Sequence, residues 1–280
     1  METRSQERIQ HLLAAHGILV GPSSLEEGVT RFQEQGGLLV DGIIGPATLW
    51  ALQQNLLGSQ LKLERCPADK LPGIDGFDNL TLRADVALAY QKLYDEAKSL
   101  GGNVTTAGGI RRLTSGANSN RSVLSHHYWA GAFDLSLVSG FFAPQRDPFV
   151  IEKRGDRHWT VWMRADGGQD VTLNAIHWDS WNSGRDRFQK VEGKFVNFTE
   201  LCEKHGFSNI GARVGFTRSS NRQYGSAEWW HFQYERALFP EVSQIGIELL
   251  RIDSYTEARI RRDNPGLWAQ ARTVFKRGWA

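Results

Sequence analysis

The chain has 280 residues, of which 40% are hydrophobic, so it can bury the core of one large domain or of two smaller ones. Charged residues make up 23% and the formal net charge is +2, which argues against a nucleic-acid binder held mainly by phosphate contacts. Its two cysteines, Cys66 and Cys202, lie far apart, which excludes a disulfide scaffold and a cysteine-rich zinc site.

The amino-terminal twenty residues do not resemble a secretory signal. Glu2, Arg4, Glu7 and Arg8 stand where such a signal needs an uninterrupted apolar core. No later stretch has the roughly 20 apolar residues that a membrane-spanning helix needs. We therefore expect a protein that is synthesised in the cytoplasm without a signal peptide and has no membrane span.

The first part of the chain has the pattern of short helices. Apolar residues at helical spacing predict helices over residues 5–15 and 25–35. Two tight turns follow, and Thr48 stands near the start of a third helix. Residues 1–57 are therefore predicted to form a small three-helix domain.

The stretch GVTRFQEQGGLLVDGIIGPATLWALQ resembles the second half of the three-helix peptidoglycan-binding domain of many bacterial cell-wall hydrolases. The matching residues are Phe32, Gln33, Gly37, Leu38, Asp41, Gly42, Gly45, Thr48 and Leu52. Most of them serve turns and the core, so the resemblance identifies a module more firmly than a binding site. It covers about residues 5–57 and implies peptidoglycan as the partner.

The remainder of the chain mixes helical and β-like patterns. Residues 58–80 have no sustained period and are predicted to be a linker or an irregular first segment. An apolar stripe predicts a helix over 81–100, and residues 103–113 have the pattern of a strand that runs into a turn. Alternating runs predict a β-rich insertion at about 138–197, followed by a short helix over 198–205.

A last helical pattern begins near residue 241 and stops before Pro265. Residues 81–280 are therefore predicted to form one α+β domain.

Two short stretches contain the residue types of a catalytic zinc site. SHHYWAGAFDL, at 125–135, contains His126, His127 and Asp134, and AEWWHFQY, at 227–234, contains Glu228 and His231. A catalytic zinc takes three protein ligands and keeps one position open, with a carboxylate nearby that can take a proton.

The spacing within the first stretch sets a condition on its geometry. Side chains alternate along a strand, so His127 and Asp134, seven residues apart, can share a metal only if the chain turns between them. We expect this turn at Gly131, after which an alternating strand resumes.

The first stretch resembles the S-x-H-x-x-G-x-A-x-D motif of the zinc D-Ala-D-Ala peptidases. This family includes vancomycin-resistance dipeptidases and carboxypeptidases and phage endolysins, and it shares a fold with lysostaphin-type enzymes and hedgehog domains. The match implies that His127 and Asp134 are zinc ligands and that Ser125 helps to hold the substrate. The family glycine falls on Ala130, and this chain has its glycine one place later.

The second stretch agrees with the E-x-W-H motif of the same family. This match implies that His231 is the third zinc ligand and Glu228 the general base. Upstream, GGIRRL resembles a Gly-aromatic-Arg segment whose arginine contacts the substrate carbonyl, which assigns that role to Arg111, with Arg112 as the register alternative. His126 is out of register and is expected to be structural.

The resemblance implies a three-helix bundle followed by a hedgehog-like or D-Ala-D-Ala-peptidase-like antiparallel-sheet domain flanked by helices. It also implies Zn²⁺-dependent hydrolysis of the stem or cross-link of peptidoglycan, by a D,D-carboxypeptidase or endopeptidase. With no export signal, delivery as a lytic phage-type endolysin or as an injected effector is expected, the second with an immunity protein or a delivery apparatus as partner.

Two other functions compete with this one. The alternative is a non-catalytic peptidoglycan-binding protein that retains the peptidase fold. A serine hydrolase built on Ser125 ranks third, because no Gly-x-Ser-x-Gly segment surrounds that residue.

Overall fold

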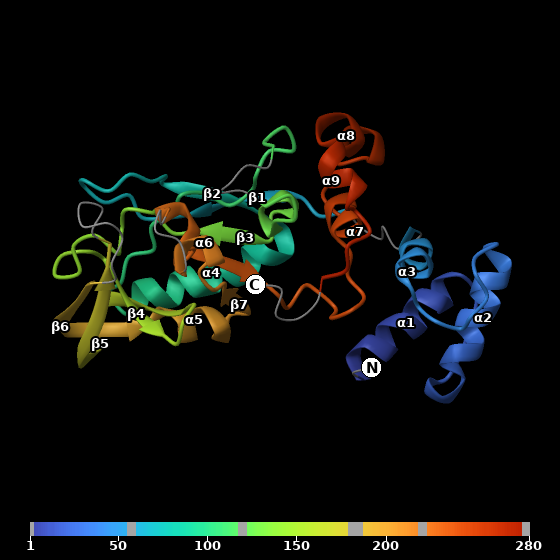
Figure 1. Cartoon of the computed structure of the whole chain (residues 1–280), viewed down its shortest axis with the longest axis horizontal. Helices are drawn as coiled ribbons and strands as arrows, with labels where there is room; N and C mark the ends of the chain where they lie inside the picture. Colours follow the sequence, from blue (N-terminus) through green and yellow to red (C-terminus); the bar gives the residue numbers. More distant parts are fainter. Residues whose placement is uncertain (1–2, 55–59, 117–121, 179–186, 218–222, 276–280) are drawn as a thin grey trace.

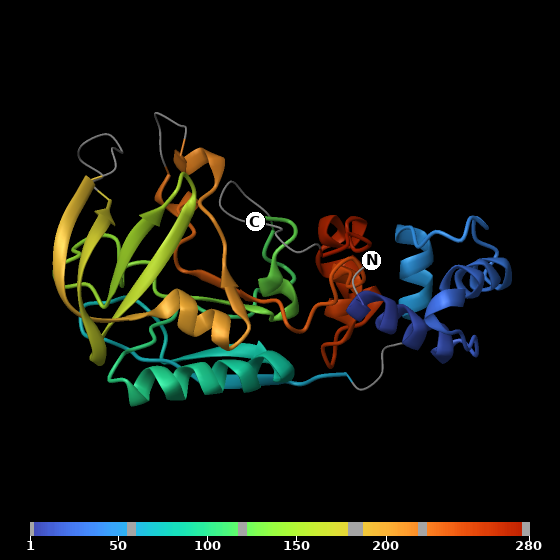
Figure 2. The same ribbon diagram turned by 90° about the horizontal axis from the view of Figure 1, so that it is seen from below.

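The computed structural model describes residues 3–54, 60–116, 122–178, 187–217 and 223–275. It is a mixed helix and sheet protein, as expected for an α+β chain, with its strands antiparallel within each sheet. Figures 1 and 2 show the amino-terminal helices at one end, the sheets at the other and the carboxy-terminal helices between them. Within the described ranges, no helix combines the length and the apolar character needed to cross a membrane.

The three predicted amino-terminal helices form. They are α1 (Thr3–Ala15), α2 (Leu25–Gln35) and α3 (Pro46–Gln53), with a 3₁₀ turn at Pro22–Ser24. The third helix begins two residues before Thr48, because the fixed φ of proline suits a first helical turn. Their shared core consists mainly of Ile9, Leu12, Leu13, Ile18, Val29, Phe32, Leu49 and Leu52.

Residues 58–80 are more regular than the predicted linker. Strand β1 (Leu63–Pro67) pairs antiparallel with β2 (Asn79–Arg83), and α4 (Ala84–Ser99) follows directly. The predicted helix therefore starts at residue 84, not 81. The reason is the alternation of Leu80 and Leu82, which are both buried on one face of a strand.

The central sheet has the order β3 (Ala132–Asp134), β8 (His231–Tyr234) and β7 (Phe207–Asn209). Its middle is fixed by Phe133, whose ring lies 5.1 Å from Tyr90 of α4 and 5.4 Å from Phe232 of β8. The strand predicted within 103–113 is not formed. Gly108 makes a single isolated bridge to Asp134 in its place.

A second sheet lies within the region of the predicted β-rich insertion. It consists of β4 (Phe149–Arg154), β5 (His158–His177) and β6 (Arg187–Asn197). Strand β5 is long because a register shift between Arg164 and Gln169 absorbs the intervening residues as a bulge. Helix α5 (Phe198–Lys204) follows, as expected.

The carboxy-terminal helix predicted as one element is broken. Helices α7 (Ile245–Leu250) and α8 (Glu257–Asp263) replace it, and α9 (Pro265–Ala269) follows after the predicted end. Ser254 adopts a left-handed φ of 72°, and Thr256 then accepts a hydrogen bond from the Arg259 N–H as the cap of α8. A short element, α6 (Val214–Thr217), lies upstream of β8.

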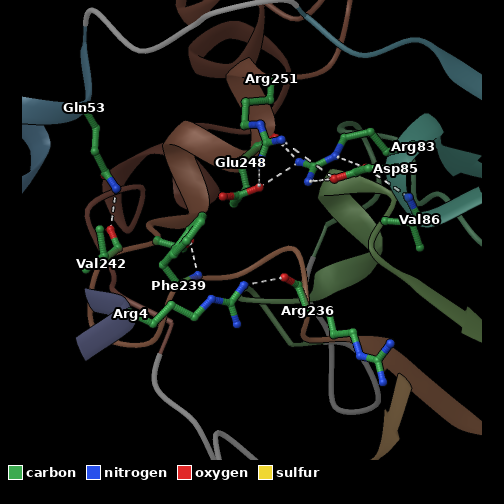
Figure 3. Close-up of polar contacts among 11 residues, drawn as sticks. Arg4, Gln53, Arg83, Asp85, Val86, Arg236, Phe239, Val242, Glu248 and Arg251 are labelled. Atoms are coloured by element: carbon green, nitrogen blue, oxygen red, sulfur yellow. Dashed lines mark hydrogen bonds and ion pairs between the residues drawn. The ribbon is translucent and has the colours of Figure 1, made fainter. Parts of the chain in front are cut away.

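The carboxy-terminal segment, residues 239–275, contacts the amino-terminal helices. Val242 belongs to their core, and the Trp50 and Trp268 rings meet edge to face with centroids 5.5 Å apart. Gln53 donates to the Val242 carbonyl (Figure 3). Residues of the predicted second domain therefore complete the core of the first.

The same segment contacts the sheets on its other side. The buried Arg83 guanidinium donates to Glu248 Oε2 of α7 at 2.8 Å and to both carboxylate oxygens of Asp85 (Figure 3). Arg251 lies 3.1 Å from the same Glu248 oxygen. The segment is thus the structural connection between the two ends of the molecule.

Candidate metal centre and active site

The first motif forms a 3₁₀ turn over His126–Trp129 that leads into β3. Ser125 caps the turn, and its Oγ accepts a hydrogen bond from the His127 N–H at 3.3 Å. Ala130 then takes the left-handed conformation, with φ 56° and ψ 33°. The turn expected at Gly131 is therefore centred one residue earlier, at the position where the related motif has glycine.

Gly131 is required for another reason. A Cβ at this position would overlap the Trp129 indole, so the absence of a side chain lets the ring lie against the backbone. The tight turn and this close approach together bring His127 back over Asp134.

Three side chains from the two motifs converge. His127 Nε2 lies 3.0 Å from His231 Nδ1 and 3.2 Å from Asp134 Oδ1, and His231 Nδ1 lies 2.9 Å from the same oxygen. The β3–β8 register, which pairs Asp134 with His231, causes this proximity. His127 directs its other nitrogen, Nδ1, to the Gly109 carbonyl, which orients Nε2 toward the cluster.

This donor set fits zinc. The edge of a tetrahedron with bonds of about 2.0 Å is roughly 3.3 Å, close to the separations within the cluster. Two imidazoles and one carboxylate are also a ligand combination that zinc accepts in catalytic sites. Within the described part of the chain, no second group of three His, Cys, Asp or Glu side chains converges in this way.

The charges of the cluster are coupled. Burial alone would raise the pKa of Asp134, but the neighbouring His127 and His231 outweigh it and hold that pKa well below its ordinary value. Burial would lower the pKa of His231, but its hydrogen bond to Asp134 and the charges of Asp134 and Glu228 raise it instead. The carboxylate is therefore ionised and available as a ligand.

His126 stands apart from the cluster, as expected from the motif spacing. Its ring meets Phe275 edge to face with centroids 4.8 Å apart, and burial holds its pKa well below the ordinary value. The carboxy-terminal segment thus packs directly behind the metal-ligand turn.

Glu228 lies beside the cluster in a strained turn. Its φ is 56°, a left-handed value that costs a non-glycine residue free energy and is found at functional sites. The Glu228 carbonyl accepts from the His231 N–H at 3.1 Å, and the preceding Ala227 carbonyl accepts from Trp159 Nε1 at 2.7 Å. The carboxylate Oε1 lies 2.5 Å from Arg213 Nε without the alignment of a hydrogen bond.

Arg111 is held against the 3₁₀ turn that contains His127 and Tyr128. Its N–H donates to the His127 carbonyl at 2.9 Å, and its guanidinium lies 5.4 Å from the centroid of the Tyr128 ring. The buried Nη1 has no hydrogen-bond partner among the described residues. The neighbouring Arg112 is exposed and, like Arg111, lines the cavity described next.

The metal-ligand cluster lines a cavity of about 980 Å³, a size typical of ligand sites. Its walls contain each residue predicted for the site: Arg111, Ser125, His127, Asp134, Glu228 and His231. They also contain Arg157 and Arg213, which sequence reasoning missed because neither belongs to a motif.

Comparisons with known proteins give two matches. Residues 7–52 match the family described as "Putative peptidoglycan binding domain". A zinc D-Ala-D-Ala carboxypeptidase of Streptomyces albus G is 33% identical over 132 residues, which cover 44% of this chain and 51% of that protein. This chain thus spans about half the length of that relative. No solved structure matches it significantly.

The two matches agree with both resemblances predicted from the motifs of the chain. The chain has an amino-terminal peptidoglycan-binding domain and is similar to the zinc D-Ala-D-Ala peptidases.

Proposed function

We propose that this chain is a zinc-dependent peptidoglycan peptidase of the D,D-carboxypeptidase or endopeptidase type. The observation that carries the proposal is the convergence of His127, Asp134 and His231 in a cavity that also contains Glu228 and Arg111. The similarity to a zinc carboxypeptidase and the peptidoglycan-binding domain support the same substrate class.

Each residue has a role that its position suits. His127, Asp134 and His231 would hold zinc, which supplies a Lewis acid when bound. Glu228 takes a proton from the attacking water and passes it to the leaving amine. Arg111 has an unpartnered Nη1 that can donate to the oxygen on which negative charge develops, and Ser125 positions the peptide.

Hydrolysis of purified sacculi tests the proposal. The full chain is expected to release free amino groups, to lose this activity with a chelator and to regain it with zinc. The Glu228→Gln variant should bind zinc with the wild-type stoichiometry, yet hydrolyse roughly 100- to 10,000-fold more slowly. A zinc-loaded chain that binds sacculi without releasing amino groups would instead establish the non-catalytic binding protein.

We also propose that the protein acts on the wall as an endolysin or an injected effector. Two versions of the chain, one expressed with a cleavable export leader and one without, test the site of action. Lysis only with the leader is expected for an injected effector, whereas an endolysin should also cause lysis without a leader once a membrane pore is co-expressed.

A further inference from the structure

Two arginines on the cavity wall have no role in the proposed reaction. Arg157 lies in the turn between β4 and β5, and Arg213 immediately precedes α6. Both line the same cavity as the metal-ligand cluster. They are 56 residues apart in sequence, so their proximity to one site depends on how the second sheet is attached.

The two segments are joined by a pair of hydrogen bonds between Arg157 and Ala212, one from the Arg157 side chain and one from the Ala212 backbone. Arg157 Nε donates to the Ala212 carbonyl at 2.6 Å, and the Ala212 N–H donates to the Arg157 carbonyl at 2.7 Å. A Cβ added at Gly211 would lie 3.0 Å from the Arg157 carbonyl oxygen, so the missing side chain permits this close approach. Arg157 is therefore fixed next to Arg213.

The start of β5 is tied to the cavity wall at two further points. Asn209 Nδ2 donates to the Trp159 carbonyl at 3.0 Å, and Trp159 Nε1 donates to the carbonyl of Ala227, the neighbour of Glu228. The second sheet is thus anchored to the wall of the cavity and carries Arg157 with it.

The cavity has more cationic than anionic side chains. Arg111, Arg112, Arg157 and Arg213 line it, against the carboxylates Asp134 and Glu228. No acidic side chain among the described residues pairs with Arg157, whereas Arg213 Nε lies 2.5 Å from Glu228 Oε1. A guanidinium binds a carboxylate through two parallel hydrogen bonds, and an excess of positive charge in a cleft attracts anions.

We propose that Arg157 and Arg213 form a carboxylate-binding subsite, which makes the cavity select peptides with a free carboxylate near the scissile bond. This inference rests on the proposed function and adds the specificity of the same site. It also assigns a role to the second sheet, because the β4–β5 turn supplies Arg157. The carboxylate can belong to the peptide end or to an acidic side chain, and both have the same chemistry.

Three matched synthetic stem peptides distinguish these sources: one with all carboxylates free, one amidated at its carboxy terminus and one amidated at its acidic side chains. The zinc-loaded Arg157→Gln and Arg213→Gln variants are expected to raise KM for the free peptide roughly 10- to 100-fold. KM for the amidated peptide that lacks the recognised carboxylate should change little. Arg154→Gln, at the exposed end of β4 outside the cavity lining, is the matched control.

Equilibrium binding of the same peptides to the chelator-treated full chain gives a readout without turnover. Preference for the free peptide in the wild type, lost in both variants and partly kept in Arg213→Lys, supports the subsite. An equal loss for free and amidated peptides in Arg213→Gln, whose side chain is 34% exposed, overturns it. If the zinc-loaded wild type cleaves no peptide but binds the free one preferentially, the proposed function fails and the subsite stands.

Discussion

At the scale of single residues, the left-handed Ala130 is the most informative position. A left-handed backbone costs an L-residue roughly 1–2 kcal/mol, and the buried methyl group of Ala130 offsets part of this cost through packing. The turn between His127 and Asp134 therefore forms with alanine at the strained position, although glycine is the residue that fits it without strain.

Substitution of Ala130 tests this account. Ala130→Gly is expected to change the free energy of unfolding by less than about 1 kcal/mol and to leave zinc stoichiometry unchanged, because lost packing and relieved strain oppose each other. Ala130→Val should destabilise by more than about 2 kcal/mol, because a branched Cβ suits neither φ 56° nor the buried site. Urea unfolding curves measure both, and a harmless valine would contradict the assigned conformation.

The coupling of Asp134 and His231 predicts how zinc binding depends on pH. The folded pKa of His231 is raised, so in the metal-free chain its stabilisation is present below about pH 6.5 and is lost as pH rises through the folded value. The pKa of Asp134 is lowered, so its contribution is present above about pH 4 and is lost as pH falls through the folded value. Zinc must displace the His231 proton, so its affinity should increase with pH.

Competition titrations with a zinc indicator measure this dependence. Below the folded pKa of His231, the apparent dissociation constant for zinc is expected to fall about tenfold for each unit by which the pH rises. Glu228→Gln should move the midpoint to lower pH, since the charge of Glu228 helps to raise the pKa of His231. A zinc affinity that is constant across this range would contradict the coupling.

Residue types and spacing permitted the two motifs to converge, and their resemblance to the zinc D-Ala-D-Ala peptidases implied which side chains would do so. The motif matches implied His127, Asp134 and His231, and the structure brings them together through a short turn and the pairing of β3 with β8. They did not predict that Arg157 lines the cavity or that Trp159 supports the Glu228 turn, because both depend on hydrogen bonds between segments more than 50 residues apart. Such contacts have no periodicity and therefore no local signal in the sequence.

At the scale of elements, helices with one clear apolar face were predictable, and elements set by distant partners were not. Helices α1 and α2 match the predicted ranges closely. Residues 81–83 look helical in isolation but join β2, because β1 supplies their backbone partners. The helical pattern after residue 241 is broken, because the segment must turn to contact two different bodies.

The Trp159 indole at the start of β5 tests whether this strand supports the turn that holds Glu228. Trp159→Phe removes the donor to the Ala227 carbonyl and should cost about 1–2 kcal/mol of stability, because a buried acceptor is left unpaired. Loss of support for the strained Glu228 turn should also lower kcat more than it raises KM. Trp162→Phe, on the same strand and outside the cavity lining, is the control, and an equal effect on kcat would contradict the role of Trp159.

At the scale of the whole molecule, the buried Arg83 determines how firmly α7 is attached. Glu248→Ala is expected to destabilise by about 3 kcal/mol, because Arg83 stays buried with only Asp85 as its acidic partner. Glu257→Ala, which removes an exposed pair with Arg261, should cost less than about 1 kcal/mol. Thermal unfolding monitored by circular dichroism compares the two, and equal losses would argue against the attachment.

The carboxy-terminal segment also limits how this architecture can be recombined in evolution. Val242 and Trp268 complete the surface of the amino-terminal helices, although more than 180 residues separate them in the chain from α3. A crossover near residue 58 would exchange the first three helices and leave their packing partners behind. An exchange of the amino-terminal helices that keeps their packing must therefore also replace the carboxy-terminal residues that contact them.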